Sequence, residues 1–344
     1  MNNSFESFYS NNVALIDKHY ANFKEKKSKG IMWMSSFGIA MIIVLTLLFV
    51  YLDSFNLFEF NILLLLSLSV VIVVALAICY YLYLKREIVV ENEGLIREII
   101  IYLSRDLHAS YEPNKRISQE SIEKMELFNL KNLKYNGKNA ILVNYKNNNM
   151  SFADMEVYYI KEKMIEETTY NEKGEKVIHR KIKKIKKHVF DGCYISATLN
   201  KRIAEHIYMI PNNISDILLN GAIKDYITYS GDEVKLENLE LSKKYKVYSD
   251  DEIQARYILS MSLMERINSI DNEFSGKKYI VFKEGRRFVI CLEGFKIEEF
   301  RKQLLPIFRS EEKEKERIKE VFNNFVKLFK IYDILDLGND LYVD

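Results

Sequence analysis

The sequence predicts an α+β fold class: a two-helix transmembrane hairpin followed by a soluble domain with an antiparallel sheet and flanking helices. Three observations predict it. Two long apolar runs without charged residues occupy residues 31–52 and 60–84. Segments rich in Val, Ile and Tyr, separated by turn residues, fill the middle of the chain. Apolar residues at helical spacing dominate the C-terminal part.

The composition of the 344-residue chain indicates an ordered protein with few special features. Domains that bind nucleic acid are usually strongly basic. The net charge of +2 therefore does not indicate a nucleic-acid partner. Cys79, Cys193 and Cys291 are far apart and form no CxxC pair. Neither a disulfide framework nor a zinc site is therefore expected, and a reducing compartment fits this usage.

Residues 1–30 are expected to form an amphipathic N-terminal helix. Its apolar stripe recurs every three or four residues and consists of Phe5, Phe8, Tyr9, Val13, Ile16, Tyr20 and Phe23. One interpretation is a helix that lies on a surface or binds a partner. The other, which we favour, is that the stripe packs against the rest of the chain.

The two apolar runs, 31–52 and 60–84, are each long enough to cross about 30 Å of hydrocarbon as a helix. The first run is preceded by Lys24, Lys26, Lys27 and Lys29, and the second is followed by Lys85 and Arg86, whereas residues 53–59 contain neither Lys nor Arg. The positive-inside rule then places both termini in the cytoplasm and predicts a multi-pass inner-membrane protein. The runs lack buried ionisable residues, so anchoring is favoured over transport.

Residues 87–344 are expected to form the cytoplasmic α+β domain. A helix is predicted over 88–111 and a short one over 118–125, followed by strands near 140–145, 155–161, 189–197, 206–210 and 246–248. A helix over 250–270 has Asp250 or Asp251 as its N-cap. A hairpin across Glu284-Gly285 joins 279–282 to 288–292, and helices over 297–308 and 311–334 end the chain.

A second hairpin is predicted around the turn at residues 171–174, which separates two long runs of β pattern. If this turn closes the hairpin symmetrically, Ile160 lies near Ile185, Glu162 near Lys183, and Glu166 near His179. Opposite charges across the two strands support the pairing.

The basic run at residues 179–188 is the strongest local feature. Its candidate contacts to an anionic surface are Arg180, Lys181, Lys183, Lys184, Lys186 and Lys187. The favoured interpretation is a strand whose charges pair with the acidic run at 156–172. The alternatives are anionic lipid headgroups and, less favoured, the phosphate backbone of nucleic acid.

The motifs of common active sites are absent from the sequence. No Walker loop, GxGxxG, GxSxG or HExxH occurs, and the five histidines form no metal-binding pattern. Cys193 lies in an apolar strand pattern and is expected to be buried and inert. We therefore predict no catalytic residue, no cofactor and no metal site, and favour a protein that is not an enzyme.

Several segments together resemble the bacterial, membrane-anchored family that carries domain of unknown function 3137. These segments are 126–128, 150–156, 189–192, 245–251, 255–259 and 264–266, in that order. At residues 136–139 the family leads us to expect a more acidic, Gly-containing turn, and the Lys-rich hairpin looks like an elaboration. The resemblance implies a class of protein and no activity.

The leading hypothesis is a membrane-tethered cytoplasmic module with a protein-interaction or scaffolding role, binding a protein partner or a second copy of itself. One alternative is an enzyme that acts on a membrane-associated substrate through a site assembled from distant residues. The other is a sensor of anionic lipid that uses the basic strand 179–188.

Overall fold

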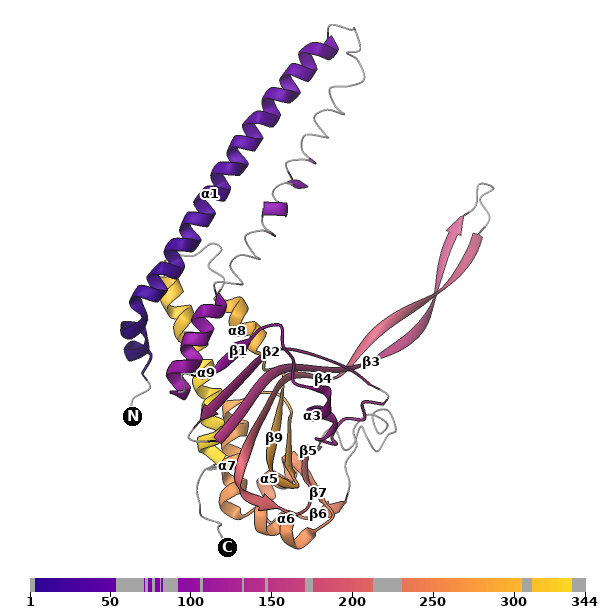
Figure 1. Cartoon of the computed structure of the whole chain (residues 1–344). Coiled ribbons are helices and arrows are strands. Elements are labelled where there is room, and N and C mark those ends of the chain that lie inside the picture. The colour runs from indigo at the N-terminus through magenta and orange to yellow at the C-terminus, as the bar shows by residue number, and fades with distance from the viewer. Residues whose placement is uncertain are drawn as a thin grey trace. The chain divides into compact units, whose positions relative to one another are not determined.

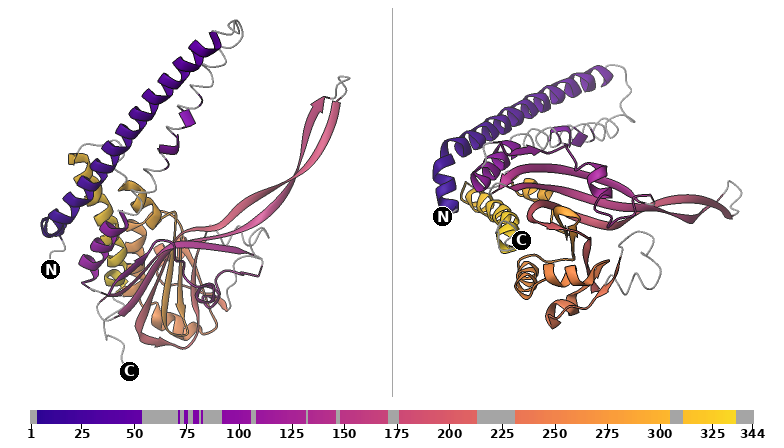
Figure 2. Two further views of the ribbon diagram at one scale, coloured as in Figure 1. Left: turned by 45° about the horizontal axis from the view of Figure 1, so that its top comes forward. Right: turned by 60° about the horizontal axis from the view of Figure 1, so that its bottom comes forward.

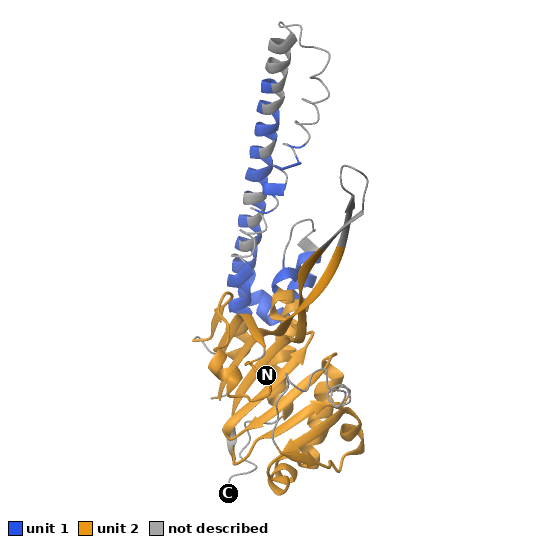
Figure 3. Ribbon diagram, turned by 90° about the vertical axis from the view of Figure 1, so that its right-hand side faces the viewer, with its two compact units in different colours: residues 1–99, 301–319 blue, residues 100–300, 320–344 orange. Residues whose placement is uncertain are grey.

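The structure is a computed structural model, shown in Figure 1. It describes residues 4–53, 71, 74–75, 78–80, 82, 92–105, 108–131, 133–145, 148–170, 176–212, 231–304 and 311–335. The chain divides into two compact units, coloured separately in Figure 3. The first contains residues 1–99 and 301–319, and the second contains residues 100–300 and 320–344.

The first unit is helical in its described part. Helix α1 (Phe5–Asp53) is continuous, and its N-terminal residues Phe5, Phe8 and Ile16 are buried. Lys315, near the start of α9 (Glu311–Leu335), pairs with Glu6 at 3.2 Å and lies 4.7 Å from the centroid of the Tyr9 ring. This arrangement agrees with the interpretation that the N-terminal apolar stripe packs against the rest of the chain.

The predicted transmembrane hairpin is contradicted. Among the helices that the structure describes, none is both long enough and apolar enough to cross a membrane. The run 31–52 is not a separate element but the second half of the 49-residue helix α1. Most of the run 60–84 lies outside the described residues. The predicted multi-pass inner-membrane localisation depended on this hairpin and is therefore contradicted by the same finding.

The second unit is built on a nine-stranded antiparallel sheet in its described part, which confirms the predicted antiparallel pairing. The strand order is β1-β2-β3-β4-β9-β8-β5-β7-β6. The strands are β1 (Ser110–Glu112), β2 (Lys134–Tyr145), β3 (Asn148–Tyr170), β4 (Lys176–Ile203), β5 (Ile207–Pro211), β6 (Asp232–Val234), β7 (Tyr245–Ser249), β8 (Lys278–Lys283) and β9 (Gly285–Glu293).

Short helices accompany the sheet: α3 (Gln119–Glu123), α5 (Leu239–Lys244), α6 (Glu252–Ile258), α7 (Met261–Glu273) and α8 (Ile297–Gln303). The N-cap predicted at Asp250 or Asp251 is confirmed at Asp251, which accepts a hydrogen bond from the Gln254 amide at 2.9 Å. The single helix predicted over 250–270 is wrong. It divides after Ile258 because the side chain of Ser260 caps the separate helix α7.

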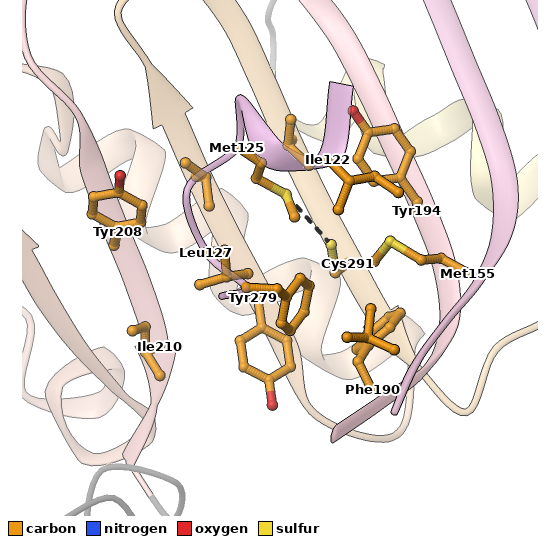
Figure 4. Close-up of a cluster of buried hydrophobic side chains, with 14 of the residues drawn as sticks. Ile122, Met125, Leu127, Met155, Phe190, Tyr194, Tyr208, Ile210, Tyr279 and Cys291 are labelled. Atoms are coloured by element: carbon orange, nitrogen blue, oxygen red, sulfur yellow. Dashed lines mark hydrogen bonds between the residues drawn. The ribbon is translucent and has the colours of Figure 1, made fainter. Parts of the chain in front are cut away.

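The sheet separates two layers of apolar side chains. On β3, Phe152 and Met155 point to opposite faces because successive strand residues alternate. Phe152 packs against Phe329 of α9, with ring centroids 5.3 Å apart. Met155 belongs to the other layer, shown in Figure 4, where α3 and the loop after it cover side chains of β3, β4, β8 and β9.

Asp154 of β3 connects the sheet to helix α8. Its carboxylate accepts hydrogen bonds from the backbone amides of Ile297 at 2.7 Å and Glu298 at 2.9 Å, the first two residues of the helix. It also accepts one from the Asn139 side chain at 2.6 Å. Burial raises the pKa of Asp154, and these three hydrogen bonds oppose the shift.

Asn139 of β2 donates the third hydrogen bond to Asp154. It lies at a bulge in β2 with a φ of 56°, a left-handed conformation that Asn tolerates better than most residues. Its amide donates to the Pro113 carbonyl at 2.8 Å, and its side-chain oxygen accepts from the Tyr111 hydroxyl at 3.0 Å. Residues 136–139, where we expected a turn, are therefore part of a bulged strand.

We expect Asp154→Ala to lower the free energy of unfolding by about 2–4 kcal/mol, because three buried donors lose their acceptor. Urea denaturation followed by circular dichroism would measure the change. Asp232→Ala is the matched control, since Asp232 is exposed on the edge strand β6 and should change stability by no more than about 0.5 kcal/mol. Equal effects of the two substitutions would contradict the role of Asp154.

Candidate functional site: the β3–β4 arm

Beyond the sheet, β3 and β4 continue as a two-stranded arm. The pairing of β3 with β2 ends at Tyr158, and β4 pairs with β9 only from Gly192 onward. Within the described residues, 159–170 and 176–187 therefore pair with each other alone. Figures 1 and 2 show this segment extending away from the neighbouring strands. We call it the arm.

The arm confirms the predicted hairpin but not its predicted register. Ile160 faces Lys186, Glu162 faces Lys184, and Glu166 faces Arg180, each one residue away from the predicted partner. The pairing also changes by one residue at the base of the arm, where Val157 pairs with Phe190 and the next pair is Tyr158 with His188. Val189 is thus the extra residue of a β-bulge.

One face of the arm pairs its charges. Arg180 lies 3.1 Å from Glu166, Lys184 lies 3.7 Å from Glu162, and Lys186 lies 2.6 Å from Glu156. The ammonium group of Lys186 is also 3.9 Å from the centroid of the Tyr158 ring. We call this the paired face.

The opposite face carries lysines, and we call it the basic face. It consists of Lys161, Lys163, Lys181, Lys183 and Lys187, all exposed, with Ile165 and Ile185 half-buried between them. Lys163 directly faces Lys183, an arrangement of like charges that destabilises a strand pair. Lys161, Lys163, Lys183 and Lys187 form no ion pair with any carboxylate of the described residues.

The structure therefore divides the six basic residues that the sequence suggested as an anionic-surface contact. Arg180, Lys184 and Lys186 belong to the paired face, and Lys181, Lys183 and Lys187 belong to the basic face. Sequence reasoning missed Lys161 and Lys163, which β3 adds to the basic face. The alternation of Lys161 and Lys163 with Glu162 and Met164 is the signal that could have identified them.

A group of three metal-ligating side chains lies at the base of the arm. One ligand atom each from Glu156, His188 and Asp191 lies within 4.8 Å of the others, a proximity that the sequence did not reveal. Lysines already neutralise both carboxylates, because Lys186 pairs with Glu156 and Lys296 lies 2.5 Å from Asp191. A cation bound here would have to displace these two ammonium groups.

Two cysteines lie within the sheet. Cys193 and Cys291 are both fully buried, and burial raises the pKa of each thiol. The Cys291 sulfur contacts the sulfur of Met125 at 4.0 Å (Figure 4). The predicted burial of Cys193 is confirmed, and because a thiolate is disfavoured at this position, its inertness stays a prediction that labelling can test.

Comparison with known proteins gives one family match. Residues 188–337 match the family described as "Protein of unknown function (DUF3137)". The chain carries a DUF3137 domain. The matched range begins within β4 and ends just after α9, so it contains Gly192, where an added Cβ would lie 1.9 Å from the Leu292 carbonyl oxygen. This close approach of backbones explains why glycine stands in the Phe190-Asp191-Gly192 segment.

The match confirms the resemblance over residues 188–337, and the bacterial origin and membrane anchoring that the resemblance implied are not part of it. No curated protein matches the chain. Among solved structures, the crystal structure of the mycobacterial trehalose monomycolate transport factor A, TtfA, matches with a TM-score of 0.33 and 8% sequence identity. The match covers 72% of this chain and 99% of that one, and at this TM-score it supports no statement about fold or function.

The register of the arm can be tested with two charge reversals of equal size. Lys163→Glu places opposite charges across from each other at Lys183, so amide hydrogen exchange in the arm should slow by roughly 1.5- to 5-fold. Lys184→Glu places like charges across from each other at Glu162, so exchange should accelerate by a similar factor. In the register predicted from the sequence, Lys184 would face Lys161, and Lys184→Glu would slow exchange instead.

The burial of the two sheet thiols predicts their reactivity. In a Cys79→Ser variant, which lacks the exposed cysteine, a disulfide reagent such as Ellman's should label less than one thiol per chain before denaturant is added and two afterwards. Rapid labelling of a native thiol would contradict the assignment of Cys193 and Cys291 as inert.

Proposed function

We propose that this protein is a non-enzymatic interaction module that uses the basic face of the β3–β4 arm to bind an acidic surface of a protein partner. The observation that supports the proposal most directly is the asymmetry of charge between the two faces of one ribbon. Basic residues on the paired face have carboxylate partners, whereas the basic face presents four lysines without one.

The arm adds nothing to the core of the domain. Its described side chains from Ile160 to Glu166 and from Arg180 to His188 are exposed or half-buried. A two-stranded ribbon that is not packed on other elements is marginally stable in water. Contact with a partner would stabilise the arm, whereas folding of the sheet does not require the arm.

Charge repulsion among the lysines of the basic face supports the proposal that the partner surface is acidic. Lys163 and Lys183 oppose each other directly, and Lys161 and Lys181 are their diagonal neighbours. Lysine on exposed strands also discourages edge-to-edge aggregation, a role that needs no partner. The approach of carboxylates would relieve the repulsion, so complementary charge would contribute both to binding and to the rate of association.

Protein is favoured over lipid as the partner because the arm also presents apolar side chains on its other face. Met164 and Ile182 are directly opposite each other on the paired face and are 63% and 64% exposed. A protein partner that encloses a narrow ribbon can contact both faces, whereas a flat lipid surface contacts one.

The proposal predicts that binding of an acidic peptide depends on one face of the arm. A fluorescent polyglutamate peptide serves as the probe, and anisotropy gives its dissociation constant. Replacing Lys161, Lys163 and Lys183 with Ala should weaken binding by about tenfold, since three exposed charge contacts contribute about 0.5 kcal/mol each.

The matched control replaces Arg180, Lys184 and Lys186 with Ala, which removes the same charge from the paired face. This variant should bind with less than about threefold change, because these groups are already neutralised by Glu166, Glu162 and Glu156. Equal losses in the two variants would contradict a face-specific interaction. Tighter binding to anionic phosphatidylserine vesicles than to the peptide would replace the protein partner with lipid.

A further inference from the structure

A cavity of about 620 Å³ lies in the second unit, apart from the arm. Its floor is formed by β2, β3, β4 and the start of β9, and its rim by residues between His108 and Ser121. Cavities of 300–1,000 Å³ are the usual size of small-molecule sites. The described chain thus contains a site of ligand size that neither the sequence motifs nor the family match assigns.

The charges around the cavity all have one sign. Its lining includes Lys115, Arg116 and Arg287, and none of its lining residues is Asp or Glu. Lys115 pairs with Glu112 at 2.6 Å. Arg116 and Arg287 form no ion pair with a carboxylate of the described residues, although the Arg116 guanidinium lies 5.5 Å from the centroid of the Tyr135 ring. Two guanidinium groups therefore remain able to bind an anion.

Hydroxyl groups form much of the polar floor, to which Asn144 and Asn149 also contribute. Ser151 of β3 and Ser196 of β4 are directly opposite each other, and their oxygens are 2.7 Å apart. Thr198 directly faces Arg287 across the β4–β9 pairing. Burial raises the pKa of Tyr194 to about 12, so its phenol stays protonated at neutral pH even though Ser196 and Arg287 act in the opposite direction. The floor thus supplies neutral donors beside the cations.

Apolar residues also line the cavity, among them Ile117, Ala140 and Leu142. Leu142 of β2 is 42% exposed and directly faces Ser151. A ligand that fills this cavity would therefore contact apolar surface as well as the polar floor.

We propose that this cavity binds an organic phosphate monoester, with the phosphate held by Arg116 and Arg287 and the organic part lying against Leu142. A phosphate dianion matches two guanidinium groups in charge and offers three oxygens for their fork of donors and for the nearby hydroxyls. A carboxylate offers only two oxygens and half that charge. The ligand is either a soluble phosphate ester or the headgroup of a phosphatidic acid, which share this chemistry.

Isothermal titration calorimetry of the full chain with glycerol 3-phosphate tests the proposal. We expect binding at one site, and we expect Arg287→Ala and Arg116→Ala each to weaken it by about tenfold or more. Arg286→Ala is the matched control, because Arg286 is the exposed neighbour on β9 and does not line the cavity. It should leave the affinity unchanged.

A second ligand distinguishes the two sources of phosphate. The second ligand is short-chain dihexanoyl phosphatidic acid. If it binds more tightly than glycerol 3-phosphate, and Leu142→Ser abolishes the difference in affinity, the natural ligand is a lipid headgroup. Equal affinities would identify a soluble ester, and both results support the site. Three results would overturn the proposal. They are no binding of glycerol 3-phosphate at millimolar concentration, a loss of affinity in Arg286→Ala equal to that in Arg287→Ala, and tighter binding of glutarate than of glycerol 3-phosphate.

Discussion

The hydrogen bonds of Asp154 fix the position of the sheet relative to the helix that follows its last strand. A buried carboxylate is costly, and here it is retained because three donors from two other parts of the chain converge on it. Two donors are the first amides of α8, where the helix dipole also favours negative charge. On the same face of β3 as Asp154, Phe152 packs against Phe329 of the terminal helix α9.

With the central strands held in this way, β3 and β4 can extend past the sheet, and the bulge at Val189 determines what the extension presents. Val189 and Phe190 are consecutive residues that both pack toward the same apolar cluster, which a regular strand does not allow. The extra residue accommodates both and shifts every later pair by one. As a result, the acids of β3 meet three of the basic residues of β4, and the other lysines collect on the second face.

The arm and the phosphate cavity use positive charge in different ways. The lysines of the arm are flexible, strongly hydrated and exposed, which suits an acidic surface met over many weak contacts. Arg116 and Arg287 border a cavity with hydroxyls on its floor, which suits a single ligand with a defined geometry. The net charge of +2 did not indicate either group of cations, because acidic residues elsewhere in the chain balance their charge.

The sequence by itself determined features that depend on a few consecutive residues: the hairpin between β8 and β9, the N-cap at Asp251, and the bounds of α9 within one residue. Turn residues, caps and helical periodicity are local, so they can be recognised without the fold. Only the tertiary structure decided the register of the arm, the link from Asp154 to α8 and the phosphate cavity, because each joins residues from separate strands. It also contradicted the transmembrane hairpin, because none of the helices that the structure describes is both long enough and apolar enough to cross a membrane.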